Sequence, residues 1–457
     1  MSGASAEGLP QRVHCVGVAG GGLSALAGLL ASRGHDVSGS DAHGAPADLV
    51  RAGVRLHRGH KAEHLGLAQL VIRSAAVPDS NVEVVAARGT DVPVLKYSEA
   101  LGRLMSTRRG LAVAGTHGKT STTAMAAHLL QSVGAGPAWI IGGQPQNMAP
   151  YAWGASGPMI VEACEYDCSF LNLSYDVALI TGMAVDHLDC FGDWAGVLSA
   201  FSRFCAGLRP GGQLVLGPGV AAQLGSEVGR DIHVLNVDDV LPLRSAEPGQ
   251  GGWRITMGHE GEHGLHLPLL GRHDVDNLRC ALVAASCYDV ELADLLAGVV
   301  SFAGVGRRLQ ELGDVSLAGG GQARVIDDFA HHPDALAAAL EAAHAHHPER
   351  RVVAVFQPHQ VCRTEDMFEQ FADVLQGFDH VALCDIFVAR DAHPERAESV
   401  CAALAEAVGP GVTRVGPARS ADENVLGLLR PTDLCLVMGA GDVDGLAQRI
   451  VGASARS

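Results

Sequence analysis

A glycine-rich loop between an apolar run and a helix-forming stretch constrains this chain more than any other feature. Leu111–Ala114 has the character of a buried strand, Gly115-Thr116-His117-Gly118-Lys119-Thr120 follows it, and Ser121–Ser132 favours a helix. Such a loop exposes consecutive backbone N–H groups, and the helix N-terminus adds partial positive charge, so the segment predicts a phosphate-binding site. Lys119 can reach β- and γ-phosphates, and the Thr120 hydroxyl can ligate Mg²⁺. The alternative, a chance Gly-Lys-Thr at a helix start, is disfavoured by the strand–loop–helix context.

The loop is shorter than the common GxxxxGK[ST] pattern, because only two residues separate its two glycines. Lys119 is one of only three lysines in the chain, the others being Lys61 and Lys96, so surface decoration is a poor explanation for its position. The residues that we expect to bind ATP in this loop are Gly115, Thr116, His117, Gly118, Lys119, Thr120 and Ser121.

Strand and helix patterns alternate along the whole chain, which predicts an α/β fold with parallel sheets. At 100–200 residues per domain, about two to four domains are expected. Similar units begin near the N-terminus, near Arg109 and after Arg308, so we predict three domains, 1–107, 108–305 and 306–457. The outer two are predicted to be Rossmann-like and the central one P-loop ATPase-like. Gln213–Leu270, which is rich in glycine and short β-like runs, is predicted to be a small antiparallel portion.

Composition excludes several classes of function. The net charge of −17 argues against non-specific nucleic-acid binding. No run of about 18 apolar residues occurs, and the first residues lack a secretory pattern, so we expect no membrane partner and a cytoplasmic location. The eleven cysteines are scattered, which favours reduced buried thiols over a zinc site.

A second glycine turn, Gly17–Gly22, follows the apolar run Val13–Val16 and precedes a helix-forming stretch. Asp41 lies at the distance where a dinucleotide-binding unit carries its ribose-binding carboxylate. However, Ala19 stands where the middle glycine of G-x-G-x-x-G is expected. Three interpretations therefore stay open: a tight turn that packs a helix on a sheet, NAD binding, or the diphosphate of another nucleotide at the helix end.

Acidic and histidine residues follow two further predicted strands of the central domain. Glu162-Ala163-Cys164-Glu165-Tyr166-Asp167 comes after Met159–Val161, and Asp186-His187 comes soon after Val177–Ile180. Either cluster alone suits a solvated loop. Because open α/β sheets bind ligands at the carboxyl ends of their strands, two such clusters together favour a metal site.

Polar residues also follow two predicted strands of the third domain. Asp327–Pro333 comes after one strand, with Pro333 placed to start a helix, and Phe356–Thr364 spans the end of the next. Histidine and arginine at such positions suit an anionic substrate, whereas capping and loop structure are the alternative for either segment alone.

Taken together, these segments resemble the Mur ligases, ATP-dependent amide-forming enzymes of peptidoglycan precursor synthesis. They occur in the family's order over nearly the whole chain. The motifs that carry the resemblance are Ala114–Thr123, Glu162–Asp167, Asp186-His187, Gly271-Arg272-His273 with Asn277, Phe302–Arg308, Asp328–Pro333 and Gly439–Asp442. Gly17–Ala27 with Gly39-Ser40-Asp41, and Phe356–Thr364, are most similar to the branch that joins L-alanine to UDP-N-acetylmuramate.

The resemblance implies a carboxylate activated by ATP as an acyl phosphate, with Mg²⁺, or alternatively Mn²⁺, in the site. It implies a UDP-binding first domain, an ATP-binding central domain and a third domain that closes on both, in a monomer or weak homodimer. The implied catalytic residues are Lys119, His187, Asp328, His331 and Arg363. The implied metal ligands are Thr120, Glu162 and His187, and the implied further ATP contacts are His273, Asn277 and Arg307. The implied substrate-binding residues are Gly20, Gly22, Ser40, Asp41, His331, His359 and Arg363.

The chain departs from the family pattern at Ala19, Gly182, Ala184, Asp274 and Gln360, and no lysine follows Lys119 to be carbamylated as in some relatives. Three alternatives to the L-alanine branch remain. They are a ligase that recycles murein tripeptide, a Mur-like protein that binds nucleotide without turnover, and, on the first glycine turn alone, an NAD-dependent oxidoreductase.

Overall fold

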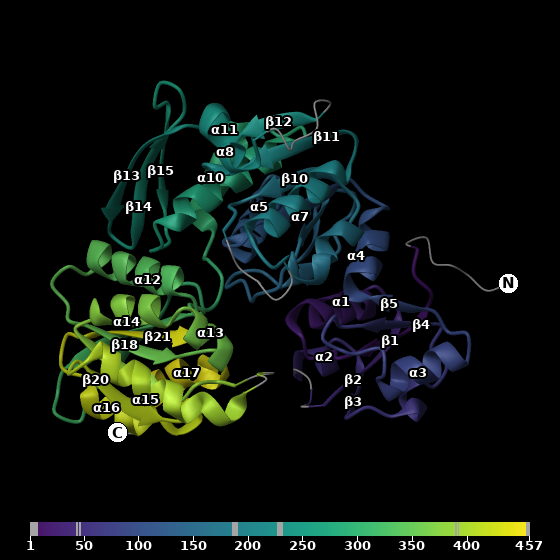
Figure 1. Ribbon diagram of the computed structural model, residues 1–457. Helices are drawn as coiled ribbons and strands as arrows, with labels where there is room; N and C mark the ends of the chain where they lie inside the picture. The colour runs from purple at the N-terminus through teal and green to yellow at the C-terminus, as the bar shows by residue number, and fades with distance from the viewer. Residues whose placement is uncertain are drawn as a thin grey trace. The chain divides into compact units, whose positions relative to one another are not determined.

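The computed structural model describes residues 8–453, apart from residues 43, 45–46, 185–190, 226–231, 389–390 and 392. The chain forms two compact units, the first built around an N-terminal and a central sheet and the second around a C-terminal sheet. Helices cover mainly parallel sheets in both units (Figure 1), which confirms the predicted α/β class.

The N-terminal sheet has the strand order β3-β2-β1-β4-β5, with every pair parallel. Its strands are β1 (Arg12–Val16), β2 (Asp36–Asp41), β3 (Arg55–Arg58), β4 (Leu70–Arg73) and β5 (Val94–Lys96). Its helices are α1 (Gly21–Ser32), α2 (Ala47–Arg51), α3 (Val82–Gly89) and α4 (Tyr97–Met105). Val13, Cys15 and Val37 share one buried core with the apolar side chains of α1. The strand order reverses at β1, so the first glycine turn lies at the point where such sheets bind ligands.

The central sheet has the order β12-β11-β10-β6-β9-β7-β8 and is parallel except for β8. Its strands are β6 (Gly110–Ala114), β7 (Ala138–Ile140), β8 (Tyr151–Ala152), β9 (Met159–Glu162), β10 (Tyr175–Ile180), β11 (Leu208–Leu216) and β12 (His233–Asn236). Its helices include α5 (Lys119–Ser132), α7 (Trp194–Ala206), α8 (Val220–Leu224), α9 (Val237–Val240), α10 (His273–Ser286) and α11 (Leu292–Gly298).

The antiparallel portion predicted for Gln213–Leu270 is wrong over its first part. There, β11 and β12 extend the parallel central sheet, and a separate three-stranded sheet forms only from β13 (Leu243–Gly249), β14 (Gly252–Met257) and β15 (His263–Leu267). The reason lies in Leu214-Val215-Leu216, which is buried at all three positions, as a parallel strand covered on both faces requires.

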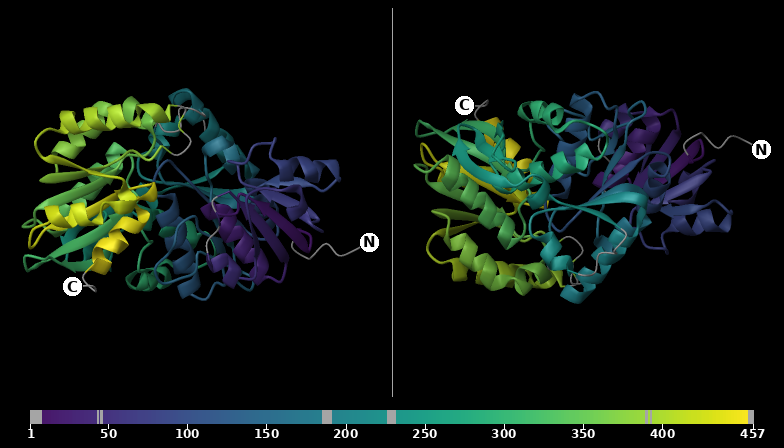
Figure 2. Two further views of the ribbon diagram at one scale, coloured as in Figure 1. Left: turned by 90° about the horizontal axis from the view of Figure 1, so that it is seen from below. Right: turned by 90° about the horizontal axis from the view of Figure 1, so that it is seen from above.

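The C-terminal sheet has the order β16-β17-β21-β18-β19-β20, with only β16 antiparallel to its neighbour. Its strands are β16 (Gln310–Ser316), β17 (Gln322–Asp328), β18 (Val352–Gln357), β19 (His380–Cys384), β20 (Val412–Gly416) and β21 (Leu434–Gly439). Its helices are α12 (Pro333–His346), α13 (Val361–Asp366), α14 (Phe368–Gln376), α15 (Ala397–Val408), α16 (Asp422–Leu428) and α17 (Leu446–Ala453). Helices lie on both faces of this sheet (Figure 2), because α12, α14 and α15 share one buried core with it and α16 and α17 share another.

The ten cysteines among the described residues are free thiols, and seven of them are buried. The buried ones are Cys15, Cys205, Cys280, Cys287, Cys384, Cys401 and Cys435. This bears out the expectation of reduced, buried thiols. Over the described residues, none of the helices combines the length and apolar character needed to cross a bilayer.

Candidate active site

The Lys119 loop has a backbone that only glycine adopts easily at two positions. Gly115 has φ +134° and Gly118, the N-cap of α5, has φ +80°. A Cβ at Gly115 would lie 2.2 Å from Thr181 Oγ1, and one at Gly118 would lie 2.3 Å from Asn277 Oδ1. The helix begins at Lys119 rather than at the predicted Ser121, so the lysine belongs to the first helical turn.

Lys119 is held as a buried ion pair. Its Nζ donates to Glu165 Oε1 at 2.9 Å and to the Gly115 carbonyl at 2.6 Å. Both side chains are largely buried, that of Lys119 being 17% exposed and that of Glu165 4%. Burial alone lowers the pKa of the ammonium, but the Glu165 carboxylate outweighs it, so the Lys119 pKa is raised above its ordinary value. The loop therefore presents a fixed positive charge where a phosphate would lie.

Backbone contacts with the segment after β10 fix the shape of this loop. Thr116 N donates to the Gly182 carbonyl at 2.9 Å, and Ala184 N donates to Thr116 Oγ1 at 2.9 Å. Gly182 and Ala184, two of the departures from the family pattern, thus serve the loop through backbone atoms. A Cβ at Gly182 would meet open space, so the fold does not require glycine there.

Two side-chain oxygen atoms that could ligate a metal lie together beside Lys119. Thr120 Oγ1 is 3.2 Å from Glu162 Oε2, and Glu162 Oε1 accepts from Gly142 N at 2.7 Å. Glu162 ends β9, directly beside the strand that leads into the Lys119 loop. A carboxylate and a hydroxyl are ligands that suit Mg²⁺, so the predicted metal ligands fit that ion. The predicted third ligand, His187, and Asp186 lie outside the described residues.

Asn277 and His273 both lie on α10. Asn277 is buried and accepts a hydrogen bond from Thr122 Oγ1 at 3.2 Å, so it anchors α10 to the helix of the Lys119 loop. His273, the first residue of α10, is about half exposed, with Nε2 3.8 Å from the carboxylate of Asp274. Asp274 is another departure from the family pattern. Ser121, the last predicted ATP-binding residue of the loop, is buried in the first turn of α5.

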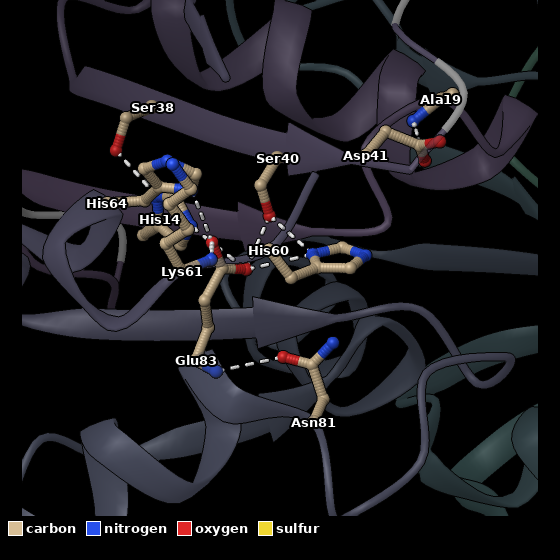
Figure 3. Close-up of polar contacts among 10 residues, drawn as sticks. All are labelled: His14, Ala19, Ser38, Ser40, Asp41, His60, Lys61, His64, Asn81 and Glu83. Carbon is tan, nitrogen blue, oxygen red and sulfur yellow. Dashed lines mark hydrogen bonds and ion pairs between the residues drawn. The ribbon is translucent and has the colours of Figure 1, made fainter. Parts of the chain in front are cut away.

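The first glycine turn is clamped onto the end of β2. Gly17 N and Val18 N both donate to the Ser40 carbonyl, at 2.8 and 3.1 Å, and Ala19 N donates to Asp41 Oδ2 at 3.1 Å (Figure 3). Because Ala19 contributes its backbone, the missing glycine does not cost this contact.

Two glycines form the start of α1. Gly20 is the N-cap of α1, where the backbone N–H groups of the helix start face out. A Cβ at Gly22 would lie 3.0 Å from the ring of Tyr97, so the helix start passes tightly over that side chain. The turn thus offers the helix-end geometry that suits a diphosphate.

In the C-terminal unit, the structure brings together the predicted His331, His359 and Arg363. The rings of His331 and His359 meet edge to face at 5.9 Å, and His359 stacks on Phe387 at 5.6 Å. His331 Nδ1 is 2.8 Å from the Phe329 carbonyl and must carry the proton, which leaves Nε2 as an acceptor. Burial, together with the nearby charge of Arg363, lowers the pKa of His331 to about 3. The pKa of His359 is lowered by the same two causes.

Arg307 and Asp328 join the segment before β16 to the end of β17. Arg307 has φ +59°, donates to the Gly439 carbonyl at 2.6 Å, and lies 3.4 Å from Asp327 Oδ1. The two oxygens of Asp328 accept from Leu309 N at 2.6 Å and Ala330 N at 2.7 Å, and burial raises its pKa. Asp328 is thus seen holding the backbone, whereas its predicted contact with ATP stays a prediction.

Two acidic partners of the predicted cations were missed or misjudged from the sequence. Asp327, the partner of Arg307, has a pKa raised by burial to about 6. The sequence placed Glu165 only in an acidic cluster suited to a metal, whereas the structure pairs it with Lys119.

Gln360, another departure from the family pattern, lies at the start of α13. Its backbone has φ +72°, and its N–H donates to the Phe387 carbonyl, a contact that does not depend on the side chain.

Gly118→Ala is expected to weaken ATP binding about tenfold or more, because the new Cβ would meet Asn277 Oδ1 in a left-handed backbone. The matched control is Gly134→Ala, at φ +74° with open space around its Cβ. That change should carry only the left-handed backbone cost, about 1 kcal/mol. Calorimetric titration with ATP and thermal unfolding of both variants measure the difference. Equal ATP affinity in the two would contradict the steric explanation.

His331 is expected to stay neutral throughout the working pH range. With a pKa of about 3, about one molecule in a thousand carries the extra proton at pH 6, and still fewer do as pH rises. His331→Gln should therefore lower kcat/KM without changing the shape of its pH profile between pH 6 and 9. A break near pH 6.5 in the wild-type profile that vanishes in His331→Gln would contradict the neutral state.

Three features define the class of protein. They are a charged lysine in a glycine loop, oxygen atoms beside it that could ligate a metal, and a second glycine turn on a Rossmann-type sheet. The chain is a P-loop α/β protein with a further site suited to a nucleotide diphosphate.

Comparisons with known proteins make this class specific. Residues 12–109 match the catalytic domain of the Mur ligase family, residues 113–285 the Mur ligase middle domain, and residues 307–441 the Mur ligase glutamate ligase domain. UDP-N-acetylmuramate–L-alanine ligase of Laribacter hongkongensis is 36% identical, over 96% of this chain and 97% of that protein. The ligase of the same name from Halorhodospira halophila is 38% identical, over 99% and 95%. The chain belongs to the Mur ligase family, a family of ATP-dependent ligases.

A solved structure agrees with this assignment. UDP-N-acetylmuramate–alanine ligase of Thermotoga maritima superposes with a TM-score of 0.82 at 26% identity, covering 97% of this chain and 99% of that one. The three-domain α/β architecture predicted from the sequence is confirmed by these matches.

Proposed function

We propose that this protein is the ligase that joins L-alanine to the carboxylate of UDP-N-acetylmuramate at the expense of ATP. The observation that carries the proposal is the buried Lys119–Glu165 pair in the glycine loop, in a chain whose relatives over nearly their full length bear that activity in their names. Its setting would be peptidoglycan precursor synthesis in the cytoplasm.

In the proposed reaction, a carboxylate oxygen of the muramoyl group attacks the γ-phosphorus of ATP, and the bond to ADP breaks. The alanine amine then attacks the carbonyl carbon of the acyl phosphate to form a tetrahedral intermediate. The nitrogen loses a proton, and the bond between carbon and the phosphate oxygen breaks, so that the amide forms and phosphate leaves. Lys119 and the loop N–H groups would stabilise charge on the transferring phosphoryl group. His331 Nε2, an acceptor on a neutral ring, would orient the amine rather than remove its proton.

Thr120 and Glu162 would hold Mg²⁺, which supplies positive charge beside the phosphates. His273, Asn277 and Arg307 would contact the nucleotide, and His359 and Arg363 would face the carboxylate and alanine. The first glycine turn with Ser40 and Asp41 would bind the UDP part.

One assay tests the proposal against its rivals. The protein is incubated with UDP-N-acetylmuramate, ATP and Mg²⁺, together with L-alanine, glycine, L-serine or the murein tripeptide, and phosphate release and product mass are measured. Release with L-alanine, with a product heavier by one alanyl residue, is expected. Release with the tripeptide alone would establish the recycling reaction instead. No release with any acceptor, combined with ATP binding, would establish a nucleotide-binding protein without turnover.

A further inference from the structure

The face of the N-terminal sheet opposite α1 carries a buried polar cluster where such sheets usually pack apolar side chains (Figure 3). Strand alternation places Val13, Cys15 and Val37 toward α1 and their neighbours on the other face. The Glu83 cluster, as we call it, consists of His14, Ser38, Ser40, His60, His64 and Glu83, with the backbone N–H of Lys61.

Glu83, at the start of α3, is fully buried, and its carboxylate accepts four hydrogen bonds. Its Oε1 receives His64 Nδ1 at 2.8 Å and Lys61 N at 3.2 Å. Its Oε2 receives the Ser40 hydroxyl, in a short hydrogen bond, and His60 Nδ1 at 3.1 Å. Burial would raise the pKa of the carboxyl, but His14 and Ser40 and the other partners lower it to about 2. Glu83 is therefore an ionised carboxylate, which can only accept hydrogen bonds.

An acceptor at Glu83 fixes the tautomer of His60. Because the carboxylate cannot donate and the Ser40 hydroxyl donates to that carboxylate, His60 Nδ1 carries a hydrogen, so in the neutral tautomer Nε2 is the hydrogen-bond acceptor. The far edge of the ring points away from the cluster (Figure 3), and the side chain is 22% exposed. His60 Nε2 is therefore held as a hydrogen-bond acceptor that points toward solvent in a fixed direction.

This acceptor lies at the ligand-binding edge of the sheet. His60 follows β3, and its neighbour Gly59 donates from N to the Asp41 carbonyl at 2.7 Å, so it sits beside the end of β2. The Ser40 hydroxyl is buried and committed to Glu83, and Asp41 Oδ2 binds Ala19 N. His60 thus supplies an outward-facing acceptor beside residues whose own contacts hold the glycine turn.

We propose that His60 Nε2 accepts a hydrogen bond from the uridine part of the nucleotide substrate, and that Glu83 is the positioning residue that presents it. The inference rests on the proposed function, because it takes a UDP-linked substrate at this sheet. Two donors of uridine have the required chemistry, the imide N–H of the base and a ribose hydroxyl. A protonated or oppositely tautomeric ring would turn a donor toward either of them and repel it.

His64 offers a matched control on the same carboxylate. Its Nδ1 contacts Oε1 of Glu83, but its ring stacks on His57 at 4.3 Å. Both rings line a cavity of about 310 Å³ together with Arg12, Asp36 and Arg55, the first residues of three strands. His64 therefore faces the amino ends of the strands, opposite to the edge that carries the glycine turn.

The test compares His60→Ala, His60→Gln and His64→Gln by calorimetric titration with UDP and by steady-state kinetics with UDP-N-acetylmuramate. His60→Ala should raise the Kd for UDP and the KM for the substrate about tenfold, as expected for one lost hydrogen bond, with kcat within about twofold. His60→Gln, whose amide oxygen can replace Nε2 as acceptor, should recover most of the affinity. His64→Gln should bind UDP as the wild type does.

Analogues of UDP identify the donor. Wild type is titrated with 2′-deoxy-UDP and with N3-methyl-UDP, and the analogue that lacks the bonded donor should bind about tenfold more weakly. The His60→Ala variant should bind that analogue as tightly as it binds UDP. Glu83→Gln, which turns an amide donor toward the cluster, should weaken UDP binding like His60→Ala. If that variant fails to fold by circular dichroism, the His60 variants and the analogues decide the question.

The outcomes separate the inference from the proposed function. Unchanged UDP affinity in His60→Ala, or an equal loss in His64→Gln, would overturn the inference while the ligase assay still succeeds. Wild-type protein that binds no UDP and forms no product would overturn the proposed function and the inference with it.

Discussion

Lys119→Ala is expected to lower kcat about 1,000-fold or more while the protein still binds UDP through its N-terminal sheet. The loss follows from the removal of a fixed charge at the transferring phosphoryl group, where a single stabilising donor is worth about 10²–10³ in rate. Phosphate release with UDP-N-acetylmuramate, L-alanine and ATP measures it. Lys119→Arg should stay strongly impaired, because a planar guanidinium does not replace a compact ammonium held by Gly115 and Glu165.

This substitution has a second effect that must be separated from the first. Without Lys119, the buried Glu165 carboxylate has lost its ammonium partner, and breaking such a pair costs about 3–5 kcal/mol. The double variant Lys119→Ala with Glu165→Gln should recover much of the thermal stability and none of the activity. Arg324→Ala, in a partly exposed pair with Asp314, serves as a charge-removal control with normal kcat. A Lys119→Ala enzyme within tenfold of wild type would contradict the assigned role.

Glu162→Gln is expected to lower kcat about 100-fold at millimolar Mg²⁺ and to raise the Mg²⁺ concentration needed for half-maximal activity. The amide preserves the shape and can still accept from Gly142 N, but it removes the negative charge that a divalent cation requires beside Thr120. A titration of activity against Mg²⁺ measures the shift.

Glu162→Asp provides the comparison, because it keeps the charge and shortens the side chain. It should retain more activity than Glu162→Gln and a Mg²⁺ dependence nearer to wild type. An unchanged Mg²⁺ dependence in Glu162→Gln would contradict the metal role. Thermal unfolding in each case establishes that the variants are folded.

The Lys119 loop could be predicted because its chemistry lies in consecutive residues between a strand and a helix. Its counter-ion could not, since Glu165 lies 46 residues further along the chain and was one of several acids in its segment. The C-terminal cluster was predicted in composition, as His331, His359 and Arg363 follow neighbouring strands. The lowered pKa of His331 could not be predicted, because it follows from the burial of that side chain, which a sequence pattern does not specify.

The Glu83 cluster could not be predicted from the sequence. Its members are scattered from His14 to Glu83, and each of them alone suits an exposed surface or a helix start. Only strand alternation combined with the parallel order β3-β2-β1-β4 brings them to one buried face. Similarly, β11 was assigned to the wrong sheet because burial on both faces follows from its neighbours and not from its own glycine-rich surroundings.

The buried thiols give this chain internal reporters of its own opening. Burial raises the pKa of Cys15, Cys280, Cys384 and Cys435 to about 12, so almost no thiolate exists at neutral pH while these residues are covered. Cys15 lies in the N-terminal sheet, Cys280 on α10, and Cys384 and Cys435 in the C-terminal sheet. Alkylation kinetics followed by peptide mass analysis would therefore time the exposure of the N-terminal sheet, of α10 and of the C-terminal sheet separately, without any introduced label.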